Sequence, residues 1–120
     1  MLKRLVLVLF LLSLPVFAGT YEDALSGNKN VLLYMYTDEC SMCKAYTPFF
    51  NKLAKEHADI NFVKVNAHTF EGAKLMRKFG ARYVPFVVLS SPKTKNTSVV
   101  NPYCSIDEIC MERAIKNFKG

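Results

Sequence analysis

The 120-residue sequence contains no internal repeat, no low-complexity tract and no long polar linker. These absences exclude a repeat architecture or an extended disordered chain, and the length then fits a single domain. The sequence also lacks a long block of basic residues and a basic stripe with interleaved aromatic side chains. The net charge of +6 therefore indicates a solvated basic surface, and we expect no nucleic-acid partner.

Histidine is also scarce in this chain. The two histidines, His57 and His68, are isolated in the sequence and form no ligand pair with a cysteine. Zinc sites built from histidine and cysteine need closely spaced ligand pairs, which these histidines do not supply. We therefore interpret His57 and His68 as surface or strand-end residues. We therefore expect no resident metal and no cofactor.

The first residues have the pattern of a secretory signal peptide over 1–18. Lys3 belongs to a short basic start, residues 5–12 form an unbroken apolar run, and the small residue Ala18 closes the segment. This pattern predicts cleavage after Ala18 and export to the periplasm. The alternative is an uncleaved anchor facing the periplasm, although the run is short for a membrane span and Pro15 stands where a span would continue.

Alternating helix-like and strand-like segments predict an α/β domain over residues 19–120. Apolar stripes at helical spacing and short β-branched or aromatic runs indicate the order α-β-α-β-α-β-β-α. We expect helices over residues 20–27, 41–57, 70–79 and from 105 onward, and strands over 31–36, 60–65, 86–89 and 97–100. A helical crossover makes the first two strands parallel, and a short turn makes the last two antiparallel. The strands then form a central four-stranded mixed β-sheet flanked by helices.

Local signals predict where these helices bend, end and begin. Pro48 falls inside the helix expected over residues 41–57 and removes one backbone hydrogen bond, which bends the helix. Gly80 follows the third helix and suits a left-handed stop. Ser105 and Glu108 have the spacing of a capping box, so we expect the last helix to begin at Ser105.

Cys40 and Cys43 are separated by two residues at the start of the second expected helix. Unpaired backbone N–H groups and the helix dipole favour negative charge there, which lowers the pKa of the Cys40 thiol and forms the nucleophilic thiolate. Asp38 and Glu39 oppose this charge, so we expect a moderate effect. Cys43 lies one turn further in and is more shielded. We expect Cys40 to attack a substrate disulfide and Cys43 to attack Cys40 and release the product.

Other interpretations of this pair stay open at the level of sequence. The pair could be a structural disulfide, or half of a zinc site that lacks its second ligand pair. The chain could also be an exported copper-handling protein, because the two thiols together with Met35, Met42 and Met76 would suit the soft ion copper(I). A redox-inactive interaction module is a further alternative.

Two segments carry a resemblance to a known family. Residues 31–50 read VLLYMYTDECSMCKAYTPFF, with an apolar strand, a turn, C-x-x-C, a following lysine and a proline five residues past the second cysteine. Residues 78–89 read KFGARYVPFVVL, with an aromatic-Gly helix end and an aliphatic-Pro pair opening a strand. Both resemble the thioredoxin superfamily, and the short N-terminal helix resembles its small bacterial envelope members. The resemblance implies a thioredoxin-like fold and thiol–disulfide oxidoreductase activity without a cofactor.

The resemblance implies roles for further residues. A cis peptide bond between Val84 and Pro85 would face the cysteines, and the backbone of Val84 would pair with a bound substrate strand. The sequence also departs from the family pattern. Glu39 stands where the family usually has tryptophan, which this chain lacks, and Tyr34 stands where the family often has a buried acid, with Lys64 as that acid's companion. These departures argue against the rapid proton handling of a general thioredoxin.

Cys104 and Cys110 form a second pair near the last helix. Spacing favours local pairing, and an exported protein meets an oxidising environment, so a structural disulfide is the first interpretation. The alternatives are that Cys104 is a relay thiol for Cys40, or that both thiols are unpaired and buried. The resemblance places residues 101–103, which precede this pair, beside the substrate groove.

The direction of electron flow and the partners are inferred from the same resemblance. Ser41 and Met42, between the first two cysteines, lack the histidine that stabilises the thiolate in the family's strong oxidants, so we expect a reductase; a disulfide oxidant is the alternative. We expect a monomer, because the chain lacks a dimerisation domain of the isomerase kind. The expected partners are disulfide-containing exported proteins and a membrane electron donor.

Overall fold

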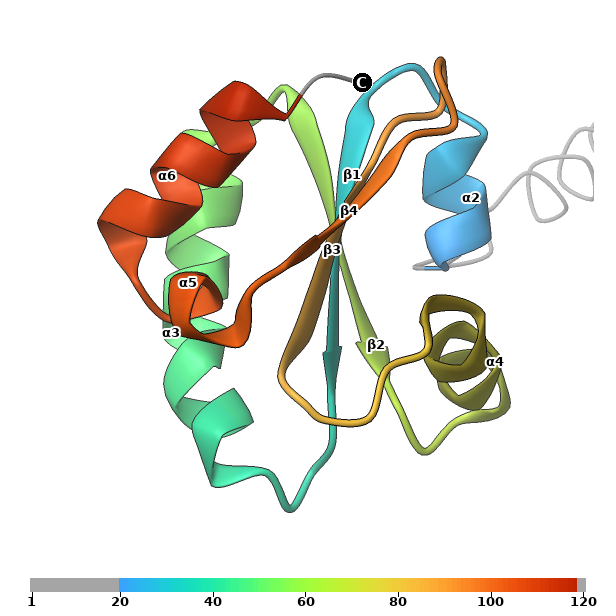
Figure 1. Ribbon diagram of the computed structural model, residues 1–120, viewed down its shortest axis with the longest axis vertical. Helices are drawn as coiled ribbons and strands as arrows, with labels where there is room; N and C mark the ends of the chain where they lie inside the picture. The colour runs from blue at the N-terminus through green and yellow to red at the C-terminus, as the bar shows by residue number, and fades with distance from the viewer. Residues whose placement is uncertain (1–19, 119–120) are drawn as a thin grey trace, which may run out of the picture.

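The computed structural model describes residues 20–118, so the expected signal peptide lies outside the described residues. Its four strands form one sheet in the order β2-β1-β3-β4 (Figure 1). β1 pairs parallel with β2 and antiparallel with β3, and β3 pairs antiparallel with β4. The expected mixed four-stranded sheet is confirmed. The strands are β1 Asn30–Tyr36, β2 Ile60–Asn66, β3 Phe86–Ser90 and β4 Thr97–Val100.

Helices cover both faces of this sheet (Figure 1). On one face lie α3 Ser41–Glu56, α5 Pro102–Ser105 and α6 Glu108–Asn117. On the other face lie α2 Tyr21–Leu25 and α4 Phe70–Phe79. None of the helices in the described part of the chain is long and apolar enough to cross a membrane.

The central strand β1 supplies the core on both faces of the sheet. Leu32 and Tyr34 pack into the cluster beneath α3 and α6, whereas Leu33 and Met35 pack into the cluster beneath α2 and α4. All four side chains are fully buried. Successive side chains of a strand point to opposite faces, so a strand covered on both faces is apolar throughout. This explains the continuous apolar run in the sequence.

The ends of α4 show why this helix lies where it does. Thr69 caps its first turn, with the side-chain oxygen accepting a hydrogen bond from the Gly72 N–H at 3.0 Å. A Cβ atom at Gly72 would lie 1.9 Å from the carbonyl oxygen of Asn66, so glycine allows the close approach of α4 to the end of β2. Gly80 ends the helix in the left-handed conformation, with φ of 63°, as expected.

The last helix differs from the sequence prediction. Ser105 belongs to the separate short helix α5, and its hydroxyl donates to the Pro102 carbonyl at 2.8 Å. α6 begins at Glu108 and is capped by Asp107, whose carboxylate accepts from the Cys110 N–H at 2.8 Å. The expected start at Ser105 is therefore wrong, because the buried Ser105 hydroxyl bonds backward into α5. The other elements begin and end within two residues of the expected bounds.

Candidate active site

The Cys40–Cys43 disulfide lies at the N-terminal end of α3. Cys40 is the N-cap residue, with an extended backbone (φ −78°, ψ 108°), and its sulfur accepts a hydrogen bond from the Cys43 N–H at 3.0 Å. A sulfur in this position occupies the place of a capping oxygen. In the reduced protein the same N–H favours the thiolate form of Cys40.

The two sulfurs differ in their access to solvent. Cys43 is 2% exposed and belongs to the core cluster beneath α3, whereas Cys40 is only partly buried. A substrate disulfide can therefore reach Cys40 far more easily than Cys43. This is the division of exposure that the spacing predicts.

The acids before the cysteine pair lie close to the end of β2 and the residues that follow it. The Asp38 carboxylate accepts a hydrogen bond from the Asn66 amide at 3.5 Å, and the Glu39 carboxylate lies 3.8 Å from Nδ1 of His68. The side chain of Glu39 is 75% exposed. Charge at such an exposed position is screened by solvent, so its opposition to a Cys40 thiolate is weak.

The segment before β3 lies against Cys40. The peptide bond between Val84 and Pro85 is cis, and the Val84 carbonyl oxygen lies 3.7 Å from the Cys40 sulfur. Tyr83, which precedes Val84 in the chain, is 41% exposed, and Met42, two residues after Cys40, is 51% exposed. An exposed apolar side chain therefore stands next to each of the two contacting segments in the sequence. The sequence motifs singled out Met42 and Val84 as residues near the site, whereas no sequence pattern singled out Tyr83.

Comparison with known proteins identifies the family of this chain. The family model for thioredoxin matches residues 14–109, which include both segments described above. The chain belongs to the thioredoxin family.

Individual thioredoxins are related to the chain over parts of their length. It is 40% identical over 60 residues to the chloroplastic F-type thioredoxin of Spinacia oleracea, covering 50% of this chain and 31% of that protein. It is 32% identical over 71 residues to the mitochondrial thioredoxin-2 of Schizosaccharomyces pombe, covering 59% of this chain and 52% of that protein. The chain thus spans about a third to a half of the length of these curated relatives.

Solved thioredoxin structures share the fold. Oxidised mitochondrial thioredoxin 3 of Saccharomyces cerevisiae superposes with a TM-score of 0.68 at 19% identity, over 82% of this chain and 87% of that one. The short form of spinach chloroplast thioredoxin F superposes with a TM-score of 0.58 at 29% identity, over 78% of this chain and 85% of that one. The first of these likenesses concerns the fold alone.

Tyr34, the residue that the family resemblance aligns with a buried acid, lies beneath the cysteine pair. Its hydroxyl donates to the Cys43 carbonyl at 2.9 Å and lies 3.2 Å from the Thr47 hydroxyl, which donates to the same carbonyl at 2.9 Å. Burial raises the pKa of Tyr34, so its hydroxyl stays protonated at neutral pH and acts as a donor. Tyr34 therefore holds the first turn of α3 in place but cannot remove a proton from Cys43.

A cavity of about 340 Å³ adjoins the buried cysteine. Its lining includes Cys43, Thr47, Asp38 and Lys64. The Lys64 side chain is exposed, as expected for a sheet-edge lysine, and its ammonium lies 4.3 Å from the centre of the Tyr36 ring. Charged and hydroxyl side chains therefore share this cavity with the buried cysteine.

A second disulfide, Cys104–Cys110, joins α5 to α6. Both cysteines are partly buried, and they line a cavity of about 580 Å³ beside β4. Of the three alternatives that the sequence left open, this structure contains the bonded pair. Just before it, Tyr103 is 83% exposed on α5.

Met42 lies between the two cysteines, but the other two methionines named for a copper site do not converge on them. Met35 is fully buried in the cluster beneath α2 and α4, and Met76 packs against that same cluster. Cys40 and Cys43 belong to the cluster on the opposite face of the sheet. A copper(I) site combining these methionines with the thiols therefore has no support in the fold.

Proposed function

We propose that the chain is an exported thiol–disulfide oxidoreductase that reduces protein disulfides through Cys40 and Cys43. The observation that carries the proposal is the pairing of a partly exposed sulfur at a helix N-cap with a buried partner sulfur. Membership of the thioredoxin family supports it.

The reaction begins with both cysteines reduced. The Cys40 thiolate attacks one sulfur of a substrate disulfide, which forms a mixed disulfide and releases the other substrate sulfur as a thiolate that takes up a proton. Cys43 then loses its proton and attacks the Cys40 sulfur. This step breaks the mixed disulfide, releases the second substrate thiolate and leaves the Cys40–Cys43 disulfide. Two electrons pass to the substrate, and a donor dithiol restores the pair by the reverse exchange.

The surroundings of Cys40 indicate how a protein substrate is held. The Val84 carbonyl lies beside the Cys40 sulfur, and the nearby chain positions 42 and 83 carry the exposed side chains of Met42 and Tyr83. An extended substrate segment can pair with the backbone at Val84 while its apolar side chains contact Met42 and Tyr83. Val84 and Pro85 are therefore substrate-binding residues in this proposal.

The reducing direction is proposed from the residues between the cysteines, and the need for a donor from a related complex. Ser41 and Met42 contain no basic group that would stabilise the Cys40 thiolate strongly enough for a powerful oxidant. One solved structure with 24% identity to this chain is a complex of thioredoxin f2 with ferredoxin:thioredoxin reductase. By analogy this chain also needs a reducing partner, and for an exported protein that partner is a membrane electron donor.

Export to the periplasm is proposed from the pattern over residues 1–18. The Cys104–Cys110 disulfide supports it, because stable disulfides are typical of oxidising compartments. Expression of the full chain in a bacterial host and intact mass analysis test the proposal. We expect an exported product that begins at Gly19. A membrane-bound product that keeps Met1 would favour the anchored alternative, and a product retained in the cytosol would exclude export.

A protein-disulfide reduction assay with a dithiol donor tests the activity. We expect Cys40→Ser to abolish reduction, and Cys43→Ser to accumulate a mixed disulfide at Cys40 because the second step is blocked. The matched control is the Cys104→Ser/Cys110→Ser pair, which should keep the activity. Retention of activity in the Cys40→Ser/Cys43→Ser pair would exclude the proposed function.

A further inference from the structure

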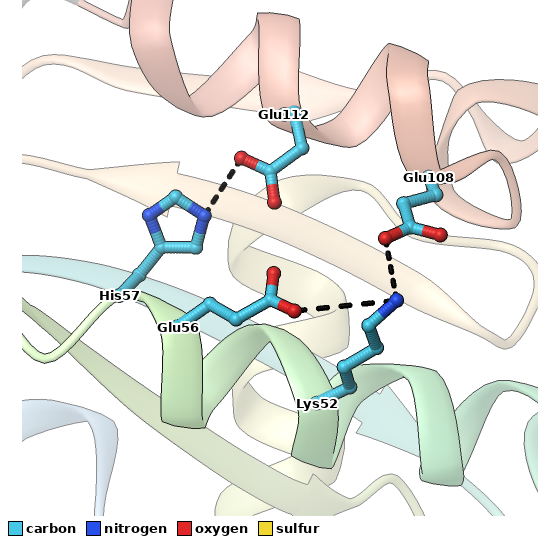
Figure 2. A network of polar contacts seen from close by, with 5 residues as sticks. All are labelled: Lys52, Glu56, His57, Glu108 and Glu112. Atoms are coloured by element: carbon cyan, nitrogen blue, oxygen red, sulfur yellow. Dashed lines mark hydrogen bonds and ion pairs between the residues drawn. The ribbon is translucent and has the colours of Figure 1, made fainter.

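Three potential metal ligands meet where the C-terminal end of α3 faces α6. They are Glu56 and His57 from the end of α3 and Glu112 from α6, and one ligand atom from each lies within 4.8 Å of the others. Figure 2 shows these side chains entering the same gap between the two helices. Nε2 of His57 already lies 2.8 Å from a carboxylate oxygen of Glu112.

Hydrogen bonds fix the backbone of His57 at the end of α3. His57 is the C-cap residue of α3; its N–H donates to the Leu53 carbonyl at 2.9 Å, and its carbonyl accepts from the Ile60 N–H at 3.1 Å. The side chain of His57 is only 20% exposed, and that of Glu112 is 39% exposed. A side chain that is mostly buried and already paired loses less freedom when it binds an ion than an exposed one does.

The lysine within this network leaves two carboxylates available. The Lys52 ammonium lies 2.6 Å from a carboxylate oxygen of Glu108 and farther away, at 4.0 Å, from one of Glu56 (Figure 2). It therefore neutralises Glu108 first, Glu112 keeps an oxygen atom against His57, and Glu56 keeps an oxygen atom in the gap that the other two side chains enter. Two carboxylates beside one imidazole attract a divalent cation.

We propose that Glu56, His57 and Glu112 bind a divalent transition-metal ion of the Zn²⁺ class. One imidazole nitrogen with two carboxylate oxygens suits Zn²⁺ and its neighbours, whereas Mg²⁺ and Ca²⁺ prefer oxygen ligands alone and copper(I) prefers sulfur. The ion takes the place of the proton between Nε2 of His57 and the Glu112 carboxylate. A cavity of about 850 Å³ lined by His57 and Glu112 leaves room for water to complete the coordination.

This site is independent of the redox chemistry at Cys40 and Cys43. It joins α3 to α6 through residues 55 positions apart in the chain. An ion bound only to the folded state stabilises that state by mass action. The inference also changes the interpretation of His57, which is isolated in the sequence but meets two carboxylates in the fold.

Zn²⁺ titration of the full chain, with all four cysteines held in disulfides, tests the proposal without thiol ligands. The chain has two histidines, so their ring signals in NMR spectra report the site directly. We expect Zn²⁺ to shift the His57 signals and leave those of His68 unchanged, and Mg²⁺ to shift neither. Unshifted His57 signals at millimolar Zn²⁺, or equal shifts of both histidines, would overturn the proposal.

Matched variants give a second readout by calorimetric titration. His57→Ala and Glu112→Gln should each weaken Zn²⁺ binding by about tenfold or more, as expected for loss of a ligand. Their control, His68→Ala, should bind Zn²⁺ as the unchanged chain does. Equal affinity in His57→Ala and His68→Ala would also overturn the proposal.

Discussion

Tyr34 and Tyr46 are in contact beneath the cysteine pair, with ring centres 4.6 Å apart, but their hydroxyls differ. The Tyr34 hydroxyl donates to the Cys43 carbonyl at 2.9 Å. The Tyr46 hydroxyl is buried and has no hydrogen-bond partner among the described residues. A buried polar group without a partner costs stability, whereas a bonded one contributes to it.

Removing the two hydroxyls should therefore have opposite effects. We expect Tyr46→Phe to raise the free energy of unfolding by about 1 kcal/mol and Tyr34→Phe to lower it by about 1 kcal/mol. Urea denaturation of both variants measures the two changes, and each variant is the control for the other. A loss of stability of the same size in both would contradict the assigned hydrogen bonding.

At the same scale, the sequence identifies some site residues and leaves others hidden. Cys40 and Cys43 are recognisable because their chemistry depends on their spacing. The contacts of Tyr34 with Cys43 and of His57 with Glu112 depend on which elements pack together. Periodicity shows the face on which a side chain lies, but not the partner that it meets across the core.

At the scale of elements, the Cys104–Cys110 disulfide ties the short helix α5 to α6. A four-residue helix has few hydrogen bonds of its own, so its position depends on such links. Because the role of this bond is structural in our proposal, its removal should loosen α5 and leave the Cys40–Cys43 pair intact.

We expect the Cys104→Ser/Cys110→Ser pair to lower the free energy of unfolding by about 2 kcal/mol, the value for closing a short loop. Thermal and urea denaturation measure this loss, and the disulfide-reduction assay serves as the control. Unchanged stability together with lost reductase activity would instead favour a relay role for Cys104.

The helix ends show how far local signals predict elements. Thr69 and Gly80 delimit α4 as expected, because cap and stop act within the helix itself. Ser105 and Glu108 have the spacing of a capping box, yet Asp107 caps α6 and the Glu108 side chain reaches Lys52 across to α3. The competing signal was Asn101 followed by Pro102, which begins a separate turn. The sequence alone does not show which of the two overlapping cap signals begins a helix, because the choice depends on how Ser105 packs.

At the scale of the whole molecule, three buried tyrosines link stability to pH. Burial is the main cause that raises the pKa of Tyr21, Tyr34 and Tyr46 above the ordinary value of 10.0. Each hydroxyl therefore holds its proton more tightly in the folded state than in the unfolded state. The contribution of these hydroxyls to the free energy of unfolding is fully present below the tyrosine pKa of the unfolded chain, and it is lost as the pH rises above that pKa.

The free energy of unfolding should consequently fall steeply as the pH rises above about 10. Urea denaturation over a series of pH values measures the fall. Tyr46→Phe removes one of the three titrating groups, so its curve should fall less steeply over the same range. A stability that stays constant through the alkaline range, or an equally steep fall in Tyr46→Phe, would contradict the assigned burial of these hydroxyls.

The central claim is that Cys40 and Cys43 form a reducing centre, and the reduction potential of this pair tests it most directly. Equilibration of the protein with dithiothreitol or glutathione gives the potential, with Cys104→Ser/Cys110→Ser used to separate the second disulfide. We predict a value near about −270 mV, as in thioredoxin-like reductants. A value near about −120 mV, as in strong periplasmic oxidants, would contradict the proposed direction of electron flow.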